Sequence, residues 1–352
     1  MNNSPPFSAK HATQSIYILF ALLLGLTFQA CQQAKSPTLD AVYSKIEIPA
    51  GICVLLGDDM LDLATHYAQT SDAMIYWQCP SDREINRART KLDTAGLLGK
   101  RVYVEKGSSS KIHLASNLAD RVITHPDPAF TQTEIMRVLR PAGQWITKSA
   151  TKIKPEPAGI DQWTHPYHGP DNNPLSKDKL AKAPYLTHFL AKPYYCPMPE
   201  VTVTAGGRIF KAFGHIAFKK REWAKLNKLT AFNGFNGAQL WERDLTPGFM
   251  IHRNTMIATP NTLYFADNES CKLIDTKTGE LRDEIFIPLN EKDVYGWKWM
   301  AMADGTLYAL LGEPDIIDEV MRGTKITAGW PWNGLGENYA KLKDQYPWGF
   351  GN

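Results

Sequence analysis

The sequence lacks the short motifs that identify many enzymes. It has no GxSxG nucleophile elbow, no P-loop, no HExxH zinc motif and no CxxCH haem attachment site. Its net charge of +3 over 352 residues is too small to indicate a nucleic-acid partner. Its five cysteines match no zinc-binding spacing, and no metal site is expected. These absences narrow the enzyme classes without excluding an unfamiliar one.

The apolar run near the N-terminus, Ile16–Phe28, is too short to cross a membrane in the usual way. A span needs about 20 apolar residues, whereas this run, preceded by Lys10, suits the hydrophobic region of a signal peptide. The small residue Ala30 before Cys31 resembles a lipobox, which implies that Cys31 is lipidated. We expect a signal peptide with lipobox over residues 1–31, an exported location in the periplasm or at the outer membrane, and membrane attachment through a lipid. An uncleaved N-terminal anchor is the alternative.

The other four cysteines are Cys53, Cys79, Cys196 and Cys271. Export would permit a disulfide, but the sequence does not decide any pairing. Cys53 and Cys79 fall in apolar, strand-like runs, and we expect both to be buried.

Residues 46–148 alternate apolar runs with helical stretches, after a polar tether over residues 32–45. We expect strands over 51–57, 73–77, 101–105, 122–124 and 144–147, and helices over 60–69, 82–95 and 131–139. Short continuous apolar runs are typical of buried parallel strands. Their alternation with helices predicts βαβ units and a parallel sheet covered on both faces.

Residues 201–352 differ, because short β-rich runs are separated there by Asn-Gly, Thr-Gly and Asp-Gly turns. Three stretches, beginning near Gly206, Asn261 and Asp304, resemble one another and form an internal repeat. Residues 149–159 carry Lys, Pro and Gly without an apolar period, which predicts a domain boundary there, and we expect residues 149–200 to form an interdomain linker or strap.

The repeat carries a recognisable pattern. Asn236–Trp241 and Lys277–Leu281 resemble one half of the PQQ-type β-propeller repeat, and Gly305–Leu310 resembles the other half. The resemblance implies four-stranded blades that stack radially, with Trp241 filling the seam between neighbours. At about 40–50 residues per blade, residues 201–352 hold roughly three to four blades, fewer than these rings usually have. We therefore expect a partial propeller whose exposed edges are covered by a protein partner or by a missing propeller portion. An unrelated β-sandwich is the alternative.

The α/β half carries a second resemblance. Glu134–Gly143 is similar to the helix and turn before the fifth strand of class I S-adenosylmethionine (SAM)-dependent methyltransferases, and Asn117–Ile123 to their fourth strand. The resemblance places cofactor-binding residues at Gly57, Asp58, Asp59 and Gln78.

The sequence departs from that family where the cofactor would bind. Only Gly57 represents the glycines of the first loop, and the side chains of Asp58 and Asp59 would intrude on a close backbone approach. Gln78 stands where the family has a carboxylate for the ribose hydroxyls, and it cannot form a charge-assisted pair. We interpret the domain as degenerate and structural, with an active methyltransferase as the alternative.

Two further segments hold candidate ligands. His165 and His168 are three residues apart, but Pro166 forbids the helix that would place both on one face. Their segment resembles the lead-in that precedes the propeller in proteins combining these two domains, and we interpret it as a strap without metal. His252 and Arg253 lie near a strand end, where propellers place ligand contacts, and would suit an anionic quinone.

The expected fold is an α/β Rossmann-like, methyltransferase-like domain followed by an all-β, partial PQQ-type propeller. The expected function is that of an exported envelope binding or scaffold protein. A SAM-dependent methyltransferase and a PQQ-dependent quinoprotein dehydrogenase are the alternatives. Neither SAM nor PQQ is favoured as a cofactor, and no catalytic residue is assigned.

Overall fold

The computed structural model describes residues 43, 45–125, 130–183, 187–249, 251, 254–287, 295–314, 317 and 320–322. The predicted signal peptide, with Cys31, and nearly all of the tether lie outside the described residues. Contacts divide the chain into two units, Met1–Ile46 and Glu47–Asn352, and every element discussed below belongs to the second. No helix among the described residues is long and apolar enough to cross a membrane.

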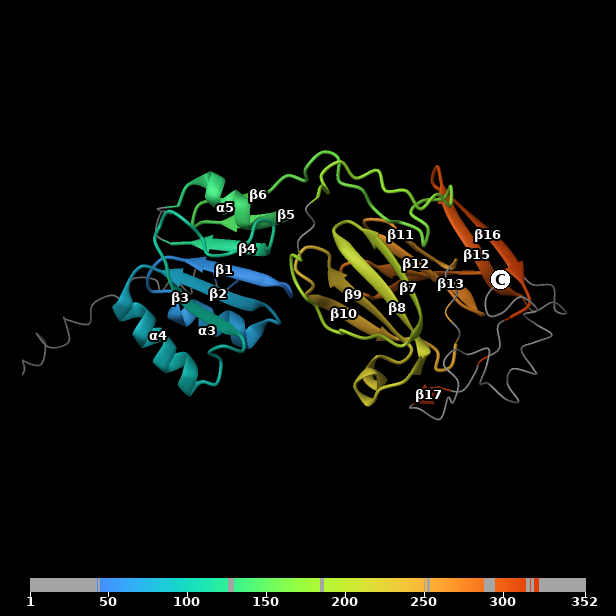
Figure 1. The fold of residues 1–352 in the computed structure, drawn as a ribbon, viewed down its shortest axis with the longest axis horizontal. Helices are drawn as coiled ribbons and strands as arrows, with labels where there is room; N and C mark the ends of the chain where they lie inside the picture. The colour runs from blue at the N-terminus through green and yellow to red at the C-terminus, as the bar shows by residue number, and fades with distance from the viewer. Residues whose placement is uncertain are drawn as a thin grey trace, which may run out of the picture. The chain divides into compact units, whose positions relative to one another are not determined.

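The first part of this unit is a six-stranded sheet with three helices (Figure 1). In chain order the elements are β1 (Ile52–Leu56), α3 (Leu61–Thr70), β2 (Met74–Cys79), α4 (Asp82–Thr94), β3 (Val102–Lys106), β4 (Ala119–Thr124), α5 (Gln132–Val138), β5 (Leu139–Ile146) and β6 (Thr151–Ile153). The strand order is β3-β2-β1-β4-β5-β6, and all neighbours are parallel except β5 and β6. The predicted alternation of strands and helices and the predicted parallel sheet are confirmed.

Helices cover both faces of this sheet, because the order in which the chain adds strands reverses after β3. From β1 it moves outward through β2 to β3, and after β3 it returns to β4 on the other side of β1. Since βαβ crossovers share one hand, α3 and α4 cover one face and α5 covers the other. Val54 and Leu56 of β1 pack in one buried cluster with Ile135 and Val138 of α5.

Side-chain caps fix where two of the helices begin. Ser81 precedes α4, and its hydroxyl accepts a hydrogen bond from Glu84 N at 3.3 Å. Thr131 precedes α5 and accepts from Glu134 N at 3.2 Å. Each cap pairs one of the backbone N–H groups that a helix leaves free in its first turn.

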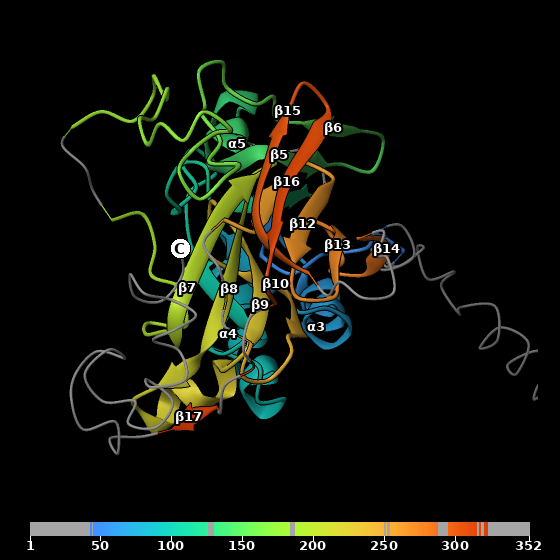
Figure 2. The same ribbon diagram turned by 90° about the vertical axis from the view of Figure 1, so that its right-hand side faces the viewer.

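The other sheets of the described chain are antiparallel, except that the short strand β17 pairs in parallel with β8 (Figures 1 and 2). The first sheet holds β7 (Met198–Ala205), β8 (Arg208–Ala217), β9 (Lys228–Asn233) and β10 (Gln239–Asp244), with the two-residue β17 (Met321–Arg322) beside the end of β8. A 3₁₀ helix, η1 (Lys220–Lys225), joins β8 to β9. The second sheet holds β11 (Met256–Ala258), β12 (Thr262–Ala266), β13 (Ser270–Asp275) and β14 (Leu281–Phe286), and the third holds β15 (Gly296–Ala303) and β16 (Thr306–Gly312).

These sheets stack in chain order. One apolar cluster joins the first sheet to the second, with Phe210 and Trp241 on one side and Leu263 and Phe265 on the other. Another joins the second sheet to the third, with Cys271 on one side and Trp297 and Met300 on the other. Repeated antiparallel sheets are therefore present, and the described residues form no closed propeller.

Trp241 lies in the seam between the first two sheets. Its indole donates to Thr276 O at 3.1 Å, and its ring lies 5.9 Å from that of Phe210. Gly279, in the turn between β13 and β14, lies against the indole, because a Cβ there would stand 2.6 Å from Trp241 Cδ2. A side chain at position 279 would clash with the indole, so the packing of Trp241 in this seam requires a glycine in the turn.

Trp241→Ala is expected to lower the free energy of unfolding by about 3–5 kcal/mol, because it leaves a cavity between two sheets and an unpaired carbonyl. Urea denaturation of the variant and the unaltered chain measures the change. Tyr308→Ala, at a side chain 55% exposed on β16, is the control and should cost about 0.5 kcal/mol or less. Equal losses in the two variants would contradict the role of Trp241.

Candidate functional site

The sheet has its switch point between β1 and β4. β1 continues through α3 toward β2, whereas β4 continues through α5 toward β5 on the other side. Open α/β sheets bind ligands outside the carboxyl ends of the strands at such a point. Gly57, Asp58 and Asp59 follow β1 directly, and Gly57 N donates to Gln78 O on β2 at 3.2 Å. The structure therefore brings the four sequence-predicted cofactor residues to one edge of the sheet.

Gly57 is required by the packing of the strand ends. Its φ is +122°, and a Cβ would lie 2.1 Å from the carbonyl oxygen of His125, which follows β4. Its own carbonyl accepts from the Trp77 indole at 2.8 Å. Only glycine combines this dihedral with this close approach. The contacts account for a glycine at this position whether or not a ligand binds.

Asp58 and Asp59 are exposed on the loop after β1. Asp59 has a φ of 56°, and its carboxylate pairs with Arg87 of α4 at 3.1 Å. Because both partners are exposed, this pair contributes little to stability. The two carboxylates occupy the place where a cofactor-binding loop would present bare backbone, so this loop fits the adenosyl group poorly.

Gln78 is 1% exposed, and its amide is used within the protein. Nε2 donates to Ser108 O at 3.1 Å and to Lys111 O at 2.8 Å, and Oε1 accepts from His113 N at 3.0 Å. Both amide hydrogens are thus committed to backbone. A Cβ on Gly107 would lie 2.3 Å from Gln78 Nε2, which shows how closely this segment covers the side chain. Gln78 has no donor left for the hydroxyls of a ribose.

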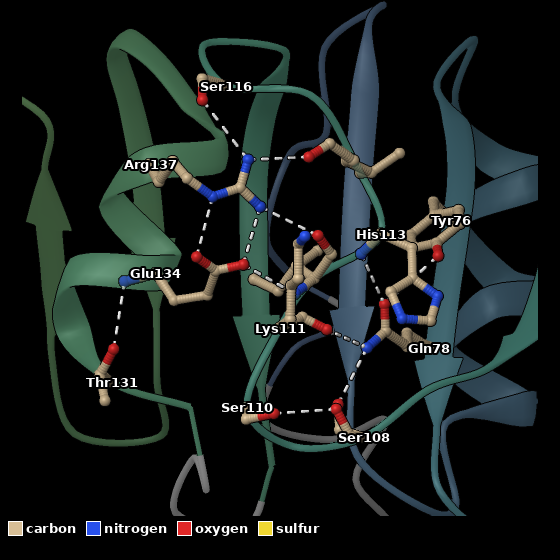
Figure 3. Close-up of polar contacts among 12 residues, drawn as sticks. Tyr76, Gln78, Ser108, Ser110, Lys111, His113, Ser116, Thr131, Glu134 and Arg137 are labelled. Carbon is tan, nitrogen blue, oxygen red and sulfur yellow. Dashed lines mark hydrogen bonds and ion pairs between the residues drawn. The ribbon is translucent and has the colours of Figure 1, made fainter.

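A second set of side chains holds the same segment from the other side (Figure 3). Glu134 Oε1 accepts from Ile112 N at 2.7 Å. Arg137 donates to the carbonyls of Ile112 and Leu114, each at 2.9 Å, and also to Glu134. Residues 107–116, which lie in the helix-free connection between β3 and β4, are therefore held by Gln78 from β2 and by Glu134 and Arg137 from α5. We call these three side chains and the segment the polar clamp.

The clamp sets the charge state of Glu134. Hydrogen bonds from Arg137 and from Ile112 N hold the pKa of Glu134 at about 2, although burial acts in the opposite direction. In the sequence, Glu134 and Arg137 stand out only as part of the segment that resembles a methyltransferase helix and turn. Their i, i+3 spacing on a helix predicts a mutual ion pair, but no local pattern reveals their backbone partners.

Tyr76 and Glu105 lie beside Gln78 on the edge of the sheet. The Tyr76 hydroxyl donates to Glu105 Oε2 at 3.0 Å, and it lies 3.3 Å from Gln78 Oε1. Burial, with the Glu105 contact, raises the pKa of Tyr76 above its usual range. The side chain of Glu105 is 51% exposed, and Glu105 on β3 is the register partner of Gln78 on β2. Glu105 is thus an accessible carboxylate next to the position where the ribose carboxylate is expected.

The strap histidines face different partners and share no ligand site. His168 Nε2 lies 2.8 Å from Asp161 Oδ2, whereas His165 contacts Thr164 and the backbone of β15. No group of three or more His, Cys, Asp or Glu side chains among the described residues is arranged to hold a metal ion. His252 and Arg253, the predicted quinone contacts, lie outside the described residues. His215 lies within β8 and is buried.

The four described cysteines, Cys53, Cys79, Cys196 and Cys271, are free. Cys53, Cys79 and Cys271 are buried, and burial raises the pKa of the Cys53 thiol to about 12. These cysteines serve as small apolar side chains, and they are poor nucleophiles in this state.

No known protein family matches the sequence, and no curated protein matches it. Solved structures do match. A candidate SAM-dependent methyltransferase from Methanococcus maripaludis is 21% identical, with a TM-score of 0.28, over 42% of this chain and 66% of its own. A SAM-dependent methyltransferase from Aquifex aeolicus is 18% identical, with a TM-score of 0.27, over 34% of this chain and 70% of its own. A geranyl diphosphate methyltransferase is 13% identical, with a TM-score of 0.27, over 31% of this chain and 45% of its own.

The strand order and the parallel register give the α/β domain a doubly wound, Rossmann-like fold. The cofactor residues that the sequence resemblance predicts are gathered at the switch point. Their side chains do not fit SAM, because Gln78 is committed to the clamp and the loop after Gly57 carries two carboxylates.

Gln78→Ala is expected to lower the free energy of unfolding by about 2–4 kcal/mol, because two carbonyls and one N–H of the clamp lose their partner. Gln78→Glu should cost at least as much, since a carboxylate cannot donate to the carbonyls of Ser108 and Lys111. Urea denaturation measures both. The control is Gln132→Ala, at an exposed glutamine whose side chain accepts a hydrogen bond from Lys152, and it should change stability by about 0.5 kcal/mol or less. A stable Gln78→Glu variant would contradict the clamp.

Glu134→Gln is expected to alter the response to acid. Because the folded pKa of about 2 lies below the ordinary value of 4.5, Glu134 stabilises the fold above about pH 4.5, and this contribution is lost as the pH falls toward 2. Urea denaturation at intervals between pH 7 and pH 2 should show a shallower acid loss in the variant. Arg137→Lys should keep the charge but lose the carbonyl contacts, and so lower stability at neutral pH. Parallel curves for Glu134→Gln and the unaltered chain would disprove the assignment.

Proposed function

We propose that this chain is an exported binding or scaffold protein of the cell envelope, anchored through Cys31, whose α/β domain serves as structure and does not transfer methyl groups. The stacked antiparallel sheets supply the binding surface in this proposal. The export and the anchor rest on the N-terminal sequence pattern, and the role of the α/β domain rests on its switch point.

The hydrogen bonding of Gln78 is the observation that carries the proposed structural role of the α/β domain. A SAM-binding edge needs a side chain at the end of β2 that is free to pair with ribose hydroxyls. Here that side chain is buried and donates both of its amide hydrogens to backbone carbonyls. Releasing it would leave those carbonyls unpaired, at about 1–3 kcal/mol each. Ligand binding would have to offset that cost before any affinity appeared.

A SAM-dependent methyltransferase is the second candidate, and the fold favours it. The strand order β3-β2-β1-β4-β5 is that of the expected family, and the solved structures that match include SAM-dependent methyltransferases. Glu105 favours it as well, because it offers an accessible carboxylate one strand away from Gln78. In this alternative Glu105 holds the ribose and the exposed loop after Gly57 adjusts to the ligand.

A PQQ-binding role for the sheets is a weaker candidate. The contact of Trp241 with the turn at Gly279 supports kinship with PQQ-type repeats. Support for the cofactor itself would have to come from His252 and Arg253, which lie outside the described residues. The proposed function therefore includes no quinone.

Calorimetric titration of the full chain in detergent with SAM tests the proposal. We expect no heat beyond dilution at millimolar ligand, and the same silence with PQQ plus Ca²⁺. A methyltransferase known to bind SAM, titrated in the same detergent, verifies that the assay detects binding. Retained cooperative unfolding in urea verifies that the silent chain is folded.

Two variants decide the matter if heat is seen. Glu105→Ala removes the accessible carboxylate of the edge, and Asp62→Ala removes an exposed carboxylate from α3 as the matched control. Micromolar binding of SAM that survives Asp62→Ala and is lost in Glu105→Ala would overturn the scaffold proposal in favour of a methyltransferase. Binding of PQQ would overturn the statement that the sheets act without a quinone.

A further inference from the structure

Three consecutive residues of the strap bond to three consecutive sheets. Trp163 N donates to the Thr204 hydroxyl at 2.9 Å, and Thr204 N of β7 donates to Trp163 O at 2.6 Å. Thr164 O accepts from Ala258 N of β11 at 2.9 Å. His165 Nε2 accepts from Met302 N of β15 at 3.0 Å. The strap thus joins the three sheets at one residue each.

The strands that the strap contacts are the first strands of their sheets, and each lies at an edge. Among the strands that the structure describes, β7 pairs with β8 alone, β11 with β12 alone, and β15 with β16 alone. β11 also contacts both β7 and β15, so the three edges lie next to one another. An edge strand carries backbone groups without a partner, and the strap supplies partners to all three. Two of the three contacts involve strap backbone, and the contact to β15 depends on the imidazole of His165.

The contact to Met302 requires neutral His165. Because Nε2 accepts from a backbone N–H, it carries no proton, and the ring proton lies on Nδ1, where it can be donated to Thr164 Oγ1 at 2.8 Å. A proton on Nε2 would face the N–H of Met302, and both groups would then be donors. His165 is 4% exposed, so water offers little compensation.

A neighbouring pair fixes the other end of the strap. His168 Nε2 bonds to Asp161 Oδ2 at 2.8 Å, and Asp161 also accepts from Lys177 N and the Ser176 hydroxyl. His165 and His168 exchange two backbone hydrogen bonds across a tight turn, at 3.3 and 3.1 Å. The turn holds the imidazole of His165 against β15, and protonation therefore has to break the contact to Met302 or strain this turn.

We propose that the segment Asp161–His168 is a pH-sensitive latch, in which neutral His165 bonds to Met302 of the third sheet and protonated His165 releases that contact. Its contacts to β7 and β11 use groups that do not titrate, and they persist in acid. Acid thus detaches the strap from β15 while the strap stays attached to the first two sheets and the apolar cluster of Cys271, Trp297 and Met300 keeps the third sheet packed on the second. The latch acts independently of any ligand of the α/β domain.

Burial favours the neutral ring of His165. Burial lowers the pKa of His165, Asp171 raises it and His168 lowers it further, with a net downward shift. Asp161 faces His168 on its far side, and the contacting residues of the sheets, Thr204, Ala258 and Met302, carry no titratable group. Because the folded pKa lies below the ordinary value of 6.5, the latch stabilises the fold fully above that pH. This contribution falls as the pH drops below 6.5.

Hydrogen exchange of the full chain, measured between pH 7.5 and pH 4.5 and corrected for the intrinsic pH dependence, tests the latch. The protection of the Met302 amide should fall by about tenfold or more over this range, which corresponds to the loss of one hydrogen bond. The Ala258 amide, bonded to Thr164 O, is the internal control and should keep its protection. Protection of Met302 that stays constant with pH, or that falls together with that of Ala258, would overturn the proposal.

Two variants separate the latch from general acid sensitivity. His165→Gln offers a neutral acceptor at every pH, and it should leave Met302 protected throughout the range. His188→Gln changes an exposed histidine and should behave as the unaltered chain does. A pH dependence at Met302 that persists in His165→Gln would refute the role of His165. If His165→Gln fails to fold, the contrast between Met302 and Ala258 in the unaltered chain still decides the outcome.

Discussion

Backbone that leaves water without forming a helix or sheet must find hydrogen-bond partners elsewhere, and two segments of this protein depend on this constraint. Residues 107–116 lie across one face of the parallel sheet, where Ile112 enters the core, and side chains of β2 and α5 pair their backbone. Residues 161–168, which are part of the strap, form hydrogen bonds with the edges of three sheets. The first segment completes the core of the α/β domain, and the second ties the antiparallel sheets together.

The same constraint limits what the switch point can do. A polar side chain that pairs buried backbone is not available to a ligand unless the backbone finds another partner. Gln78 gives both amide hydrogens to carbonyls, and Arg137 gives its guanidinium to two others, so neither can approach a cofactor without disrupting the segment. The carboxylates of Asp58, Asp59 and Glu105 remain accessible at this edge. They offer negative charge to a ligand, but they do not offer the bare backbone that a cofactor-binding loop presents.

Local pattern predicted the α/β fold and the turns of the sheets because their causes are local. Apolar runs, caps such as Ser81 and Thr131, and turn glycines such as Gly279 each act within a few residues. The predicted site residues lie near one another, since strand ends meet at one edge, but the hydrogen-bond partners of Gln78 could not be predicted. These partners belong to a segment about 30 residues away, which has no helix where the fold usually has one. The strap showed the same limit: Pro166 excluded a shared metal face, whereas the three sheet edges became visible only in the structure.

Glutamine at position 78 and the irregular course of residues 107–116 require each other. A carboxylate there would place its oxygens against the carbonyls of Ser108 and Lys111, with no proton to share, and the segment could not cover the strand end. Conversely, if residues 107–116 did not cover Gln78, Ile112 of that segment would not reach its place in the core. An acidic residue at position 78 would therefore also require a different course of residues 107–116. Introducing the acid alone would break the clamp before it created a cofactor site, because a ribose-binding edge also needs a different connection between β3 and β4.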